Sequence, residues 1–292
     1  PISGSAVSIG KTGNITVKLP DGADLDAKHQ VTVIVTDHKK APQQGKNVTV
    51  KGDLGQSAAG KTDKNGELTV PEVEQTERHG VYIVGYTDGT FGPSRSMTRS
   101  EAAAIFARLL AEKNGDAIST AANTKFADIP AHAWYSGYVK YLSNNGITYG
   151  KSKTVFAPND AITRAEFTTM AVRFFDVYGD GDAEIMEQFS GFHDVSSGYW
   201  AAEYIKYAAL HGWINGYGDG SFHAEREINR AEVVTIVNRL LGREADEDYI
   251  ADNLRKLNTF PDVSRKHWAY YAVMEAANAH TAVLGESESW SK

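Results

Sequence analysis

Three arginines recur at nearly equal intervals along the chain. Arg99, Arg164 and Arg230 lie 65 and 66 residues apart, and each follows a Thr or Asn and precedes a Glu by two positions. A planar guanidinium beside the free N–H groups of a helix start can hold a carboxylate or another anion. The same side chain can instead pair with an acidic residue of a neighbouring unit. The sequence leaves both interpretations open.

The residues around the arginines predict where helices begin. Each phrase has the spacing of an N-cap residue and an N3 glutamate: Thr98 with Glu101, Thr163 with Glu166, and Asn229 with Glu232. Apolar residues follow at helical intervals, which predicts an amphipathic helix with one buried stripe. A cation at the first helical position opposes the helix dipole, so its recurrence indicates a specific task.

Two further elements recur with the same period. A turn ending in phenylalanine precedes each helix, at 85–91, 150–156 and 216–222. A Phe-x-Asp element followed by a tryptophan leads into a second helical pattern, and the tryptophans are Trp134, Trp200 and Trp268. These rings either anchor the core or form a wall on which a sugar stacks. A fixed period of this kind means that one structural unit is used three times.

The phase of the repeat predicts how the units assemble. The chain has a half-repeat at 81–112, repeats at 126–175 and 192–241, and a first half alone at 260–281. We infer that the last half completes the unit that opens the module. One helix pair cannot bury its apolar face alone, so stacked or ring-closed copies are expected.

These motifs resemble the surface-layer homology (SLH) domain over residues 78–283. The resemblance implies an all-α pseudo-threefold helical bundle that attaches exported proteins to the bacterial cell wall. The implied ligand is a secondary cell-wall polysaccharide with pyruvate ketals, bound in grooves between repeats. By position, the implied polysaccharide-binding residues are Arg99, Arg164, Arg230, Gly85, Asp88, Gly89, Asp219, Gly220, Trp134, Trp200 and Trp268. The middle turn departs from the family pattern, with Lys151 and Lys153, so its groove is expected to bind differently or not at all.

Residues 1–75 have a different character. They contain no Phe, Tyr, Trp or Arg, and alternating runs at 14–19, 30–35, 47–51 and 67–70 predict strands. The segment resembles bacterial immunoglobulin-like repeats, which implies a small all-β immunoglobulin-like sandwich acting as a spacer. The expected fold class is therefore multi-domain, with this sandwich followed by the helical bundle. Residues 284–292 are expected to form a frayed tail.

The composition excludes several classes of function. The net charge is −7, and residues 1–75 hold nine lysines and nine acidic residues, so the acidic excess belongs to the rest. A net-negative chain without a basic tract is not expected to bind nucleic acid, and local arginines would have to attract an anionic polymer. There is no cysteine, hence no disulfide, and no apolar run long enough for membrane insertion. No signal peptide is visible at Pro1, so upstream domains of a larger surface protein are expected.

No catalytic chemistry is recognisable. The sequence shows no nucleophile motif, phosphate loop or metal-ligand spacing, and its nine histidines are scattered. We therefore expect no enzyme, no cofactor and no metal site. The function expected is non-covalent anchoring of an exported protein in the extracellular cell wall or S-layer of a Gram-positive bacterium. The alternative is a structural or protein-interaction module in which the arginines form inter-repeat salt bridges and the immunoglobulin-like domain binds a partner.

Overall fold

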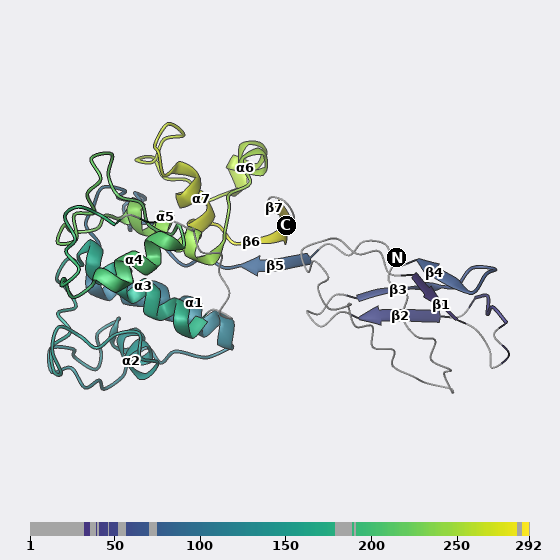
Figure 1. The fold of residues 1–292 in the computed structure, drawn as a ribbon, viewed down its shortest axis with the longest axis horizontal. Coiled ribbons are helices and arrows are strands. Elements are labelled where there is room, and N and C mark those ends of the chain that lie inside the picture. Colours follow the sequence, from purple (N-terminus) through teal and green to yellow (C-terminus); the bar gives the residue numbers. More distant parts are fainter. Residues whose placement is uncertain are drawn as a thin grey trace. The chain divides into compact units, whose positions relative to one another are not determined.

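The computed structural model (Figure 1) describes residues 32–35, 39, 41–45, 47–51, 57–69, 75–178, 189, 191–284 and 288–291. The chain divides into two compact units. The first is Pro1–Thr76 with Val283–Gly285, and the second is Glu77–Ala282 with Glu286–Lys292. Within the described residues, no helix is both long and apolar enough to cross a membrane.

The first unit contains two antiparallel strand pairs. Strand β1 (Thr32–Ile34) pairs with β4 (Glu67–Thr69), and β2 (Asn47–Lys51) pairs with β3 (Ser57–Lys61). The runs around 30–35, 47–51 and 67–70 are confirmed as strands, whereas the run 14–19 lies outside the described residues. Strand β3 was not predicted, because its small residues have little strand propensity and its pairing with β2 defines it. These two pairs do not by themselves make an immunoglobulin-like sandwich.

The second unit is built from helices with a small sheet. The helices are α1 (Arg99–Asn114), α2 (Ser136–Asn144), α3 (Arg164–Tyr178), α4 (Ala202–Leu210), α5 (Arg230–Leu241), α6 (Glu247–Asn253) and α7 (Tyr270–Ala277), with a 3-10 turn at Leu254–Lys256. The sheet has the order β5 (Gln75–His79), β6 (His280–Leu284) and β7 (Ser289–Ser291), and residues 77–79, 280–282 and 289–291 of it belong to the second unit. The helices pack as the pairs α1 with α2, α3 with α4 and α5 with α7, while α3 also packs on α1 and α5.

The predicted helix starts are confirmed. The Thr98 hydroxyl accepts the N–H of Glu101, whose carboxylate accepts the N–H of Thr98 in return. The same reciprocal pair joins Thr163 to Glu166, and Asn229 to Glu232. Each long helix therefore begins at its arginine, because the cap satisfies backbone groups that would otherwise lack partners.

A ring of backbone hydrogen bonds joins the three repeats of the second unit, at the residues that shortly precede the arginines. The N–H of Met97 donates to Ile228 O at 2.9 Å, that of Ile228 to Ile162 O at 3.0 Å, and that of Ile162 to Met97 O at 2.9 Å. All three side chains are fully buried. The circuit closes on itself, so the three copies form a pseudo-threefold arrangement.

The last half-repeat completes the first, as the phase of the sequence predicted. In every repeat, an aspartate carboxylate from the Phe-x-Asp element accepts two backbone N–H groups of the turn before the long helix. The sets are Asp128 with Phe156 and Ala157, Asp194 with Phe222 and His223, and Asp262 with Phe91 and Gly92. In the third set the aspartate and its turn come from opposite ends of the module, so the contact closes the ring.

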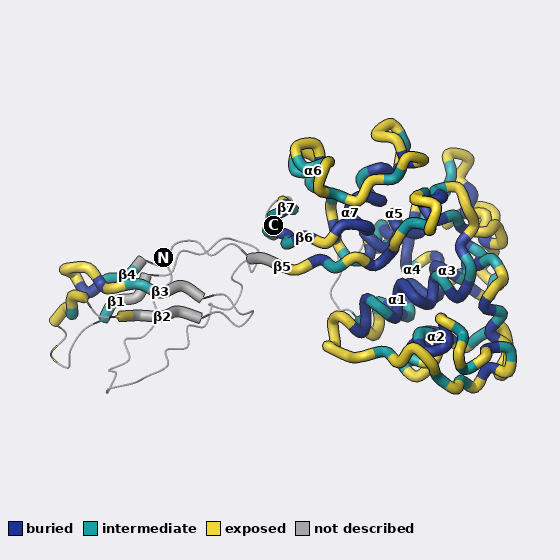
Figure 2. Tube along the Cα trace, turned by 180° about the vertical axis from the view of Figure 1, so that it is seen from behind, coloured by how far each residue is buried: buried dark blue, intermediate teal, exposed yellow. Residues whose placement is uncertain are grey.

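The core and the C-terminal segment are visible in the burial pattern (Figure 2). The helices α1, α3 and α5 are largely buried, and the ring of Phe106 packs between those of Phe167 and Phe174. The expectation of a frayed tail is wrong for 289–291. These residues form β7, and the indole of Trp290 is only 6% exposed and stacks on His280.

Candidate functional site

The three arginines lie beneath the surface, at the junctions between units. Arg99, Arg164 and Arg230 are 4%, 5% and 4% exposed. Each Nε donates to the carbonyl oxygen of the phenylalanine that ends the turn of another unit, at 2.8–2.9 Å: Phe156, Phe222 and Phe91 respectively. The α-helix start and the neighbouring turn thus fix the guanidinium together.

Each arginine also faces the capping glutamate of another repeat. The Nη1–Oε1 distances are 3.0 Å for Arg99 with Glu166, 3.1 Å for Arg164 with Glu232, and 3.9 Å for Arg230 with Glu101. The inter-repeat pairing that the sequence left open is therefore present in all three junctions. The arginines do not stand free in open clefts.

Burial and the neighbouring groups act in opposite directions on the pKa of two of these arginines. Burial lowers the pKa of Arg164, while Tyr217 and Glu232 oppose that shift. Burial likewise lowers the pKa of Arg230, opposed by Tyr86 and Glu101. Arginine retains its proton in proteins because its ordinary pKa is so high, so these two buried guanidinium groups remain positively charged.

One junction opens into a groove. A cavity of about 250 Å³ is lined by Arg164, Ile214, Asn215, Gly216, Tyr217, Glu232, Thr235, Ile236, Arg239 and Trp268. These residues come from the start of α3, the turn before α5, α5 itself and the segment before α7. Arg164 also donates from Nη2 to Asn215 O at 3.4 Å and carries Tyr217 against its face. It therefore lies in the lining of the groove while remaining held by protein partners.

The tryptophans of the repeat are exposed. Trp134, Trp200 and Trp268 are 54%, 55% and 64% exposed, so the interpretation of these rings as core anchors is wrong. Trp268 borders the groove that contains Arg164. An exposed ring beside buried cations can stack on an apolar sugar face.

The glycine-turn residues shape the loops instead of reaching into the groove. Asp88 accepts from the N–H and hydroxyl of Thr90, and Asp219 does the same for Ser221. Gly89 and Gly220 have φ of 83° and 82°, a conformation that favours glycine. Gly216 lines the cavity, and Gly85 is its counterpart in the first turn; a Cβ on either would lie within 2.5 Å of a phenylalanine ring.

The middle turn differs chemically, as expected from its sequence. Tyr86 and Tyr217 lie against the guanidinium groups of Arg230 and Arg164. Lys151 stands at the corresponding place in the middle turn, where it is exposed and pairs with Asp160 at 3.2 Å. The three junctions are therefore alike in backbone but not in the groups that surround the arginine.

A second set of arginines was missed in the sequence. Arg108, Arg173 and Arg239 also lie 65 and 66 residues apart, each seven positions after a capping glutamate. That spacing is two helical turns, so they share a helix face with the glutamates. Arg239 is exposed and lines the groove, whereas Arg108 and Arg173 are partly buried over Tyr138 and Tyr204. The repeat period alone could have identified them.

Comparison with known proteins identifies relatives of this arrangement. The family model described as the S-layer homology domain matches residues 69–103, 125–168 and 191–234. The chain is 34% identical over 218 residues to "Cell surface glycoprotein 1" of Acetivibrio thermocellus, covering 72% of this chain and 9% of that protein. It is 30% identical over 233 residues to the "Cellulosome-anchoring protein" of the same organism, covering 79% and 49%. It is 33% identical over 163 residues to the "Surface-layer 125 kDa protein" of Lysinibacillus sphaericus, covering 54% and 13%. The chain thus spans half or less of the length of these relatives.

Proposed function

Because residues 69–234 of this chain carry three S-layer homology domains, we propose that it anchors an exported protein non-covalently to secondary cell-wall polysaccharide. The chain is an extracellular, cell-wall-associated one, in keeping with its family and its surface-layer relatives. The identity of the polysaccharide, its pyruvate ketals and the upstream domains belong to the proposal.

One observation supports this proposal above the others. The groove at Arg164 brings together a buried cation, an exposed cation and an exposed indole, from Arg164, Arg239 and Trp268. A pyruvate ketal presents one carboxylate, which an arginine meets with two parallel hydrogen bonds. The sugar ring beside it offers an apolar face to the tryptophan. These are the groups that an acidic glycan requires.

The two arginines of the groove have different roles in this proposal. Arg164 already holds Glu232 and two backbone carbonyls, so it contributes positive potential and its remaining N–H donors. Arg239 is exposed and makes the principal contact with the carboxylate. Asp219 and Gly220 shape the turn that forms one wall of this groove, and Gly85, Asp88 and Gly89 shape the corresponding turn at the Arg230 junction.

The repeat extends this site to the other two junctions. The counterpart sets are Arg99, Arg173 and Trp200, and Arg230, Arg108 and Trp134. Binding of one polymer in several grooves would raise its apparent affinity without any new contact, because the second contact is intramolecular. The middle junction, with Lys151 in place of tyrosine, is expected to contribute differently.

Sedimentation with purified cell-wall sacculi tests the proposal. The full chain should bind sacculi, and binding should disappear after the secondary polymer is extracted. Arg239→Ala and Trp268→Ala should each weaken binding several-fold, while Arg255→Ala, an exposed arginine elsewhere in the unit, should not. Removal of the ketals by mild acid should weaken binding of the wild type and abolish its difference from Arg239→Ala.

Binding that survives polymer extraction, or that is unchanged in both groove variants, would rule out this site. The alternative would then apply, in which the helical unit is structural and the first unit binds a partner. The ring of ion pairs is compatible with both outcomes, since it stabilises the junctions in either case. For the first unit we propose an immunoglobulin-like spacer, with the two strand pairs as its support.

A further inference from the structure

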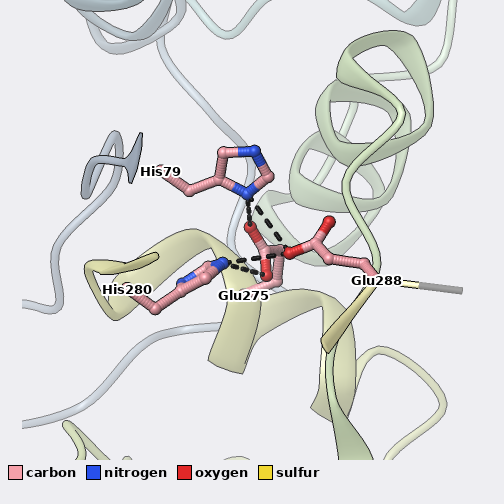
Figure 3. Close-up of side chains that lie close together, drawn as sticks. All are labelled: His79, Glu275, His280 and Glu288. Carbon is pink, nitrogen blue, oxygen red and sulfur yellow. Dashed lines mark hydrogen bonds and ion pairs between the residues drawn. The ribbon is translucent and has the colours of Figure 1, made fainter. Parts of the chain in front are cut away.

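Four titratable side chains converge in the second unit (Figure 3), and none of them lines the groove. His79 ends β5, Glu275 lies on α7, His280 begins β6 and Glu288 precedes β7. One ligand atom from each lies within 4.8 Å of all the others. The side chains are 4%, 0%, 3% and 4% exposed, so the cluster is sealed from solvent.

Four of the separations between ligand atoms are close to those of a coordination sphere. Glu288 Oε1 lies 3.3 Å from His79 Nδ1 and 3.1 Å from His280 Nε2. Glu275 lies 3.5 Å from His79 Nδ1 through Oε1 and 3.4 Å from His280 Nε2 through Oε2. An ion bound tetrahedrally at about 2.0–2.2 Å separates its ligands by roughly 3.3–3.6 Å. We propose that His79, Glu275, His280 and Glu288 form a structural binding site for a divalent transition-metal ion such as Zn²⁺.

Three polar atoms of the cluster lack a hydrogen bond. Among the described residues, both carboxylate oxygens of Glu275 and the Nδ1 of His79 are buried without a hydrogen bond of good geometry. Buried polar atoms are normally satisfied, and a buried carboxylate without a partner is especially costly. A cation at the centre would satisfy all three atoms together.

Hydrogen bonds from neighbouring groups orient His280 and Glu288, as is usual for the ligands of metal sites. The Nδ1 of His280 lies 3.0 Å from Asn278 O, to which it donates, and the ring therefore turns Nε2 toward the glutamates. Glu288 is positioned by the indole N–H of Trp290 at 3.1 Å and the backbone N–H of Glu244 at 2.9 Å. Such hydrogen bonds fix the tautomer and orientation of metal ligands.

The charge of the cluster also favours a cation. When a metal binds, the imidazoles give up their protons, and two ionised glutamates with two neutral imidazoles then carry two negative charges, which one divalent ion balances. Burial lowers the pKa of His79, but the carboxylates of Glu275, Glu288 and Glu77 outweigh burial and raise it to about 10. Protons on the imidazoles are therefore the competitor of the metal, and experiment must separate the two.

A metal here would join the first strand of the second unit to its last segments. β5 carries His79, whereas α7, β6 and the residue before β7 supply the other ligands. These segments are about 200 residues apart in the sequence. The ion would cross-link β5 to these segments beside α7, the helix that completes the ring.

Titration of the chelator-treated full chain with ZnCl₂ tests the site. We expect one equivalent to bind with a dissociation constant below about 1 μM, and Co²⁺ to give the intense visible bands of tetrahedral coordination. Zn²⁺ at about a hundredfold above that constant should raise the Tm by about 5–10 °C. Glu275→Gln should weaken binding at least about 100-fold, because even outer contacts change metal affinity by about 10–100-fold.

A matched control lies in the same cluster of contacts. Glu77 is 56% exposed and only approaches the outer nitrogen of His79, at 3.7 Å, so Glu77→Gln should weaken Zn²⁺ binding by no more than about 10-fold. If Glu275→Gln fails to fold, His79→Gln replaces it, with circular dichroism as the check on folding. Absence of saturable Zn²⁺ binding by the wild type, or equal binding by Glu275→Gln and Glu77→Gln, would overturn the proposal and leave a cluster held by protons. Neither result depends on the polysaccharide.

Discussion

Replacement of Arg99 by alanine should destabilise the helical unit by an amount that its contacts define. Arg99 is 4% exposed, donates from Nε to Phe156 O at 2.8 Å, and pairs with Glu166 at 3.0 Å. Removing one partner of a buried ion pair costs about 3–5 kcal/mol, because the other charge stays behind without compensation. Glu166 is 19% exposed, so water relieves part of that cost, while the lost bond to Phe156 adds about 1 kcal/mol. We expect a loss of about 3–4 kcal/mol.

The equivalent change at Arg164 should cost less, for a reason specific to its junction. Glu232 also contacts Arg226 and the hydroxyl of Tyr217, so it keeps partners after Arg164 is removed. We expect about 2–3 kcal/mol for Arg164→Ala, on the same basis as for Arg99. A role confined to ligand binding would predict no such difference.

Urea unfolding of the full chain, followed by the helical signal in circular dichroism, measures both losses. Arg255→Ala is the control and should stay within about 0.5 kcal/mol of the wild type, since its side chain is exposed. A double-mutant cycle with Glu166→Gln should show coupling with Arg99 but not with Arg255. A loss below about 1 kcal/mol for Arg99→Ala, or a larger loss for Arg164→Ala than for Arg99→Ala, would refute the conclusion that these arginines stabilise the contacts between repeats.

Three further outcomes are expected. Burial raises the pKa of Asp194, but two backbone N–H bonds outweigh it and leave the pKa below its usual value. The stability that Asp194 contributes is thus present above its unfolded pKa of about 3.9 and is lost as the pH falls through the lower folded value. In Asp194→Asn, the free energy of unfolding should therefore decrease less steeply at acid pH than in the wild type, as measured by unfolding at a series of pH values. Gly216→Ala would place a Cβ 2.4 Å from the ring of Phe192 and should cost about 1–3 kcal/mol in urea unfolding, whereas Gly218→Ala, with nothing within 4 Å, should change little. Trp268→Ala should shift the free energy of unfolding by no more than about 0.5 kcal/mol, since the ring is 64% exposed, and a larger loss would return this residue to the core.

Local patterns predicted the architecture of the second unit well. The helix caps at Thr98, Thr163 and Asn229 were predictable because a cap depends on residues only three positions apart. The closure of the ring was predictable because the repeat begins and ends with complementary halves. The same period contained Arg239 and its two counterparts, although they were not recognised.

Features that depend on burial or on distant partners were decided by the tertiary structure. Sequence analysis could not choose between open and paired arginines. For Arg99 and Arg164 the choice depends on a glutamate 67 and 68 residues away, and for Arg230 it depends on closure of the ring. The exposure of Trp268 and the formation of the strand that contains Trp290 are likewise decided by tertiary packing.

The histidine–glutamate cluster shows the limit most clearly. His79 stands about 200 residues from Glu275, His280 and Glu288, and none of the intervals has the short spacing of a metal motif. By itself the sequence determined the repeating unit, its helix caps and its number of copies, since these follow from periodicity and local hydrogen bonding. Only the folded chain decided which charged groups lose water together, because proximity across a closed ring is set by packing and not by separation along the sequence.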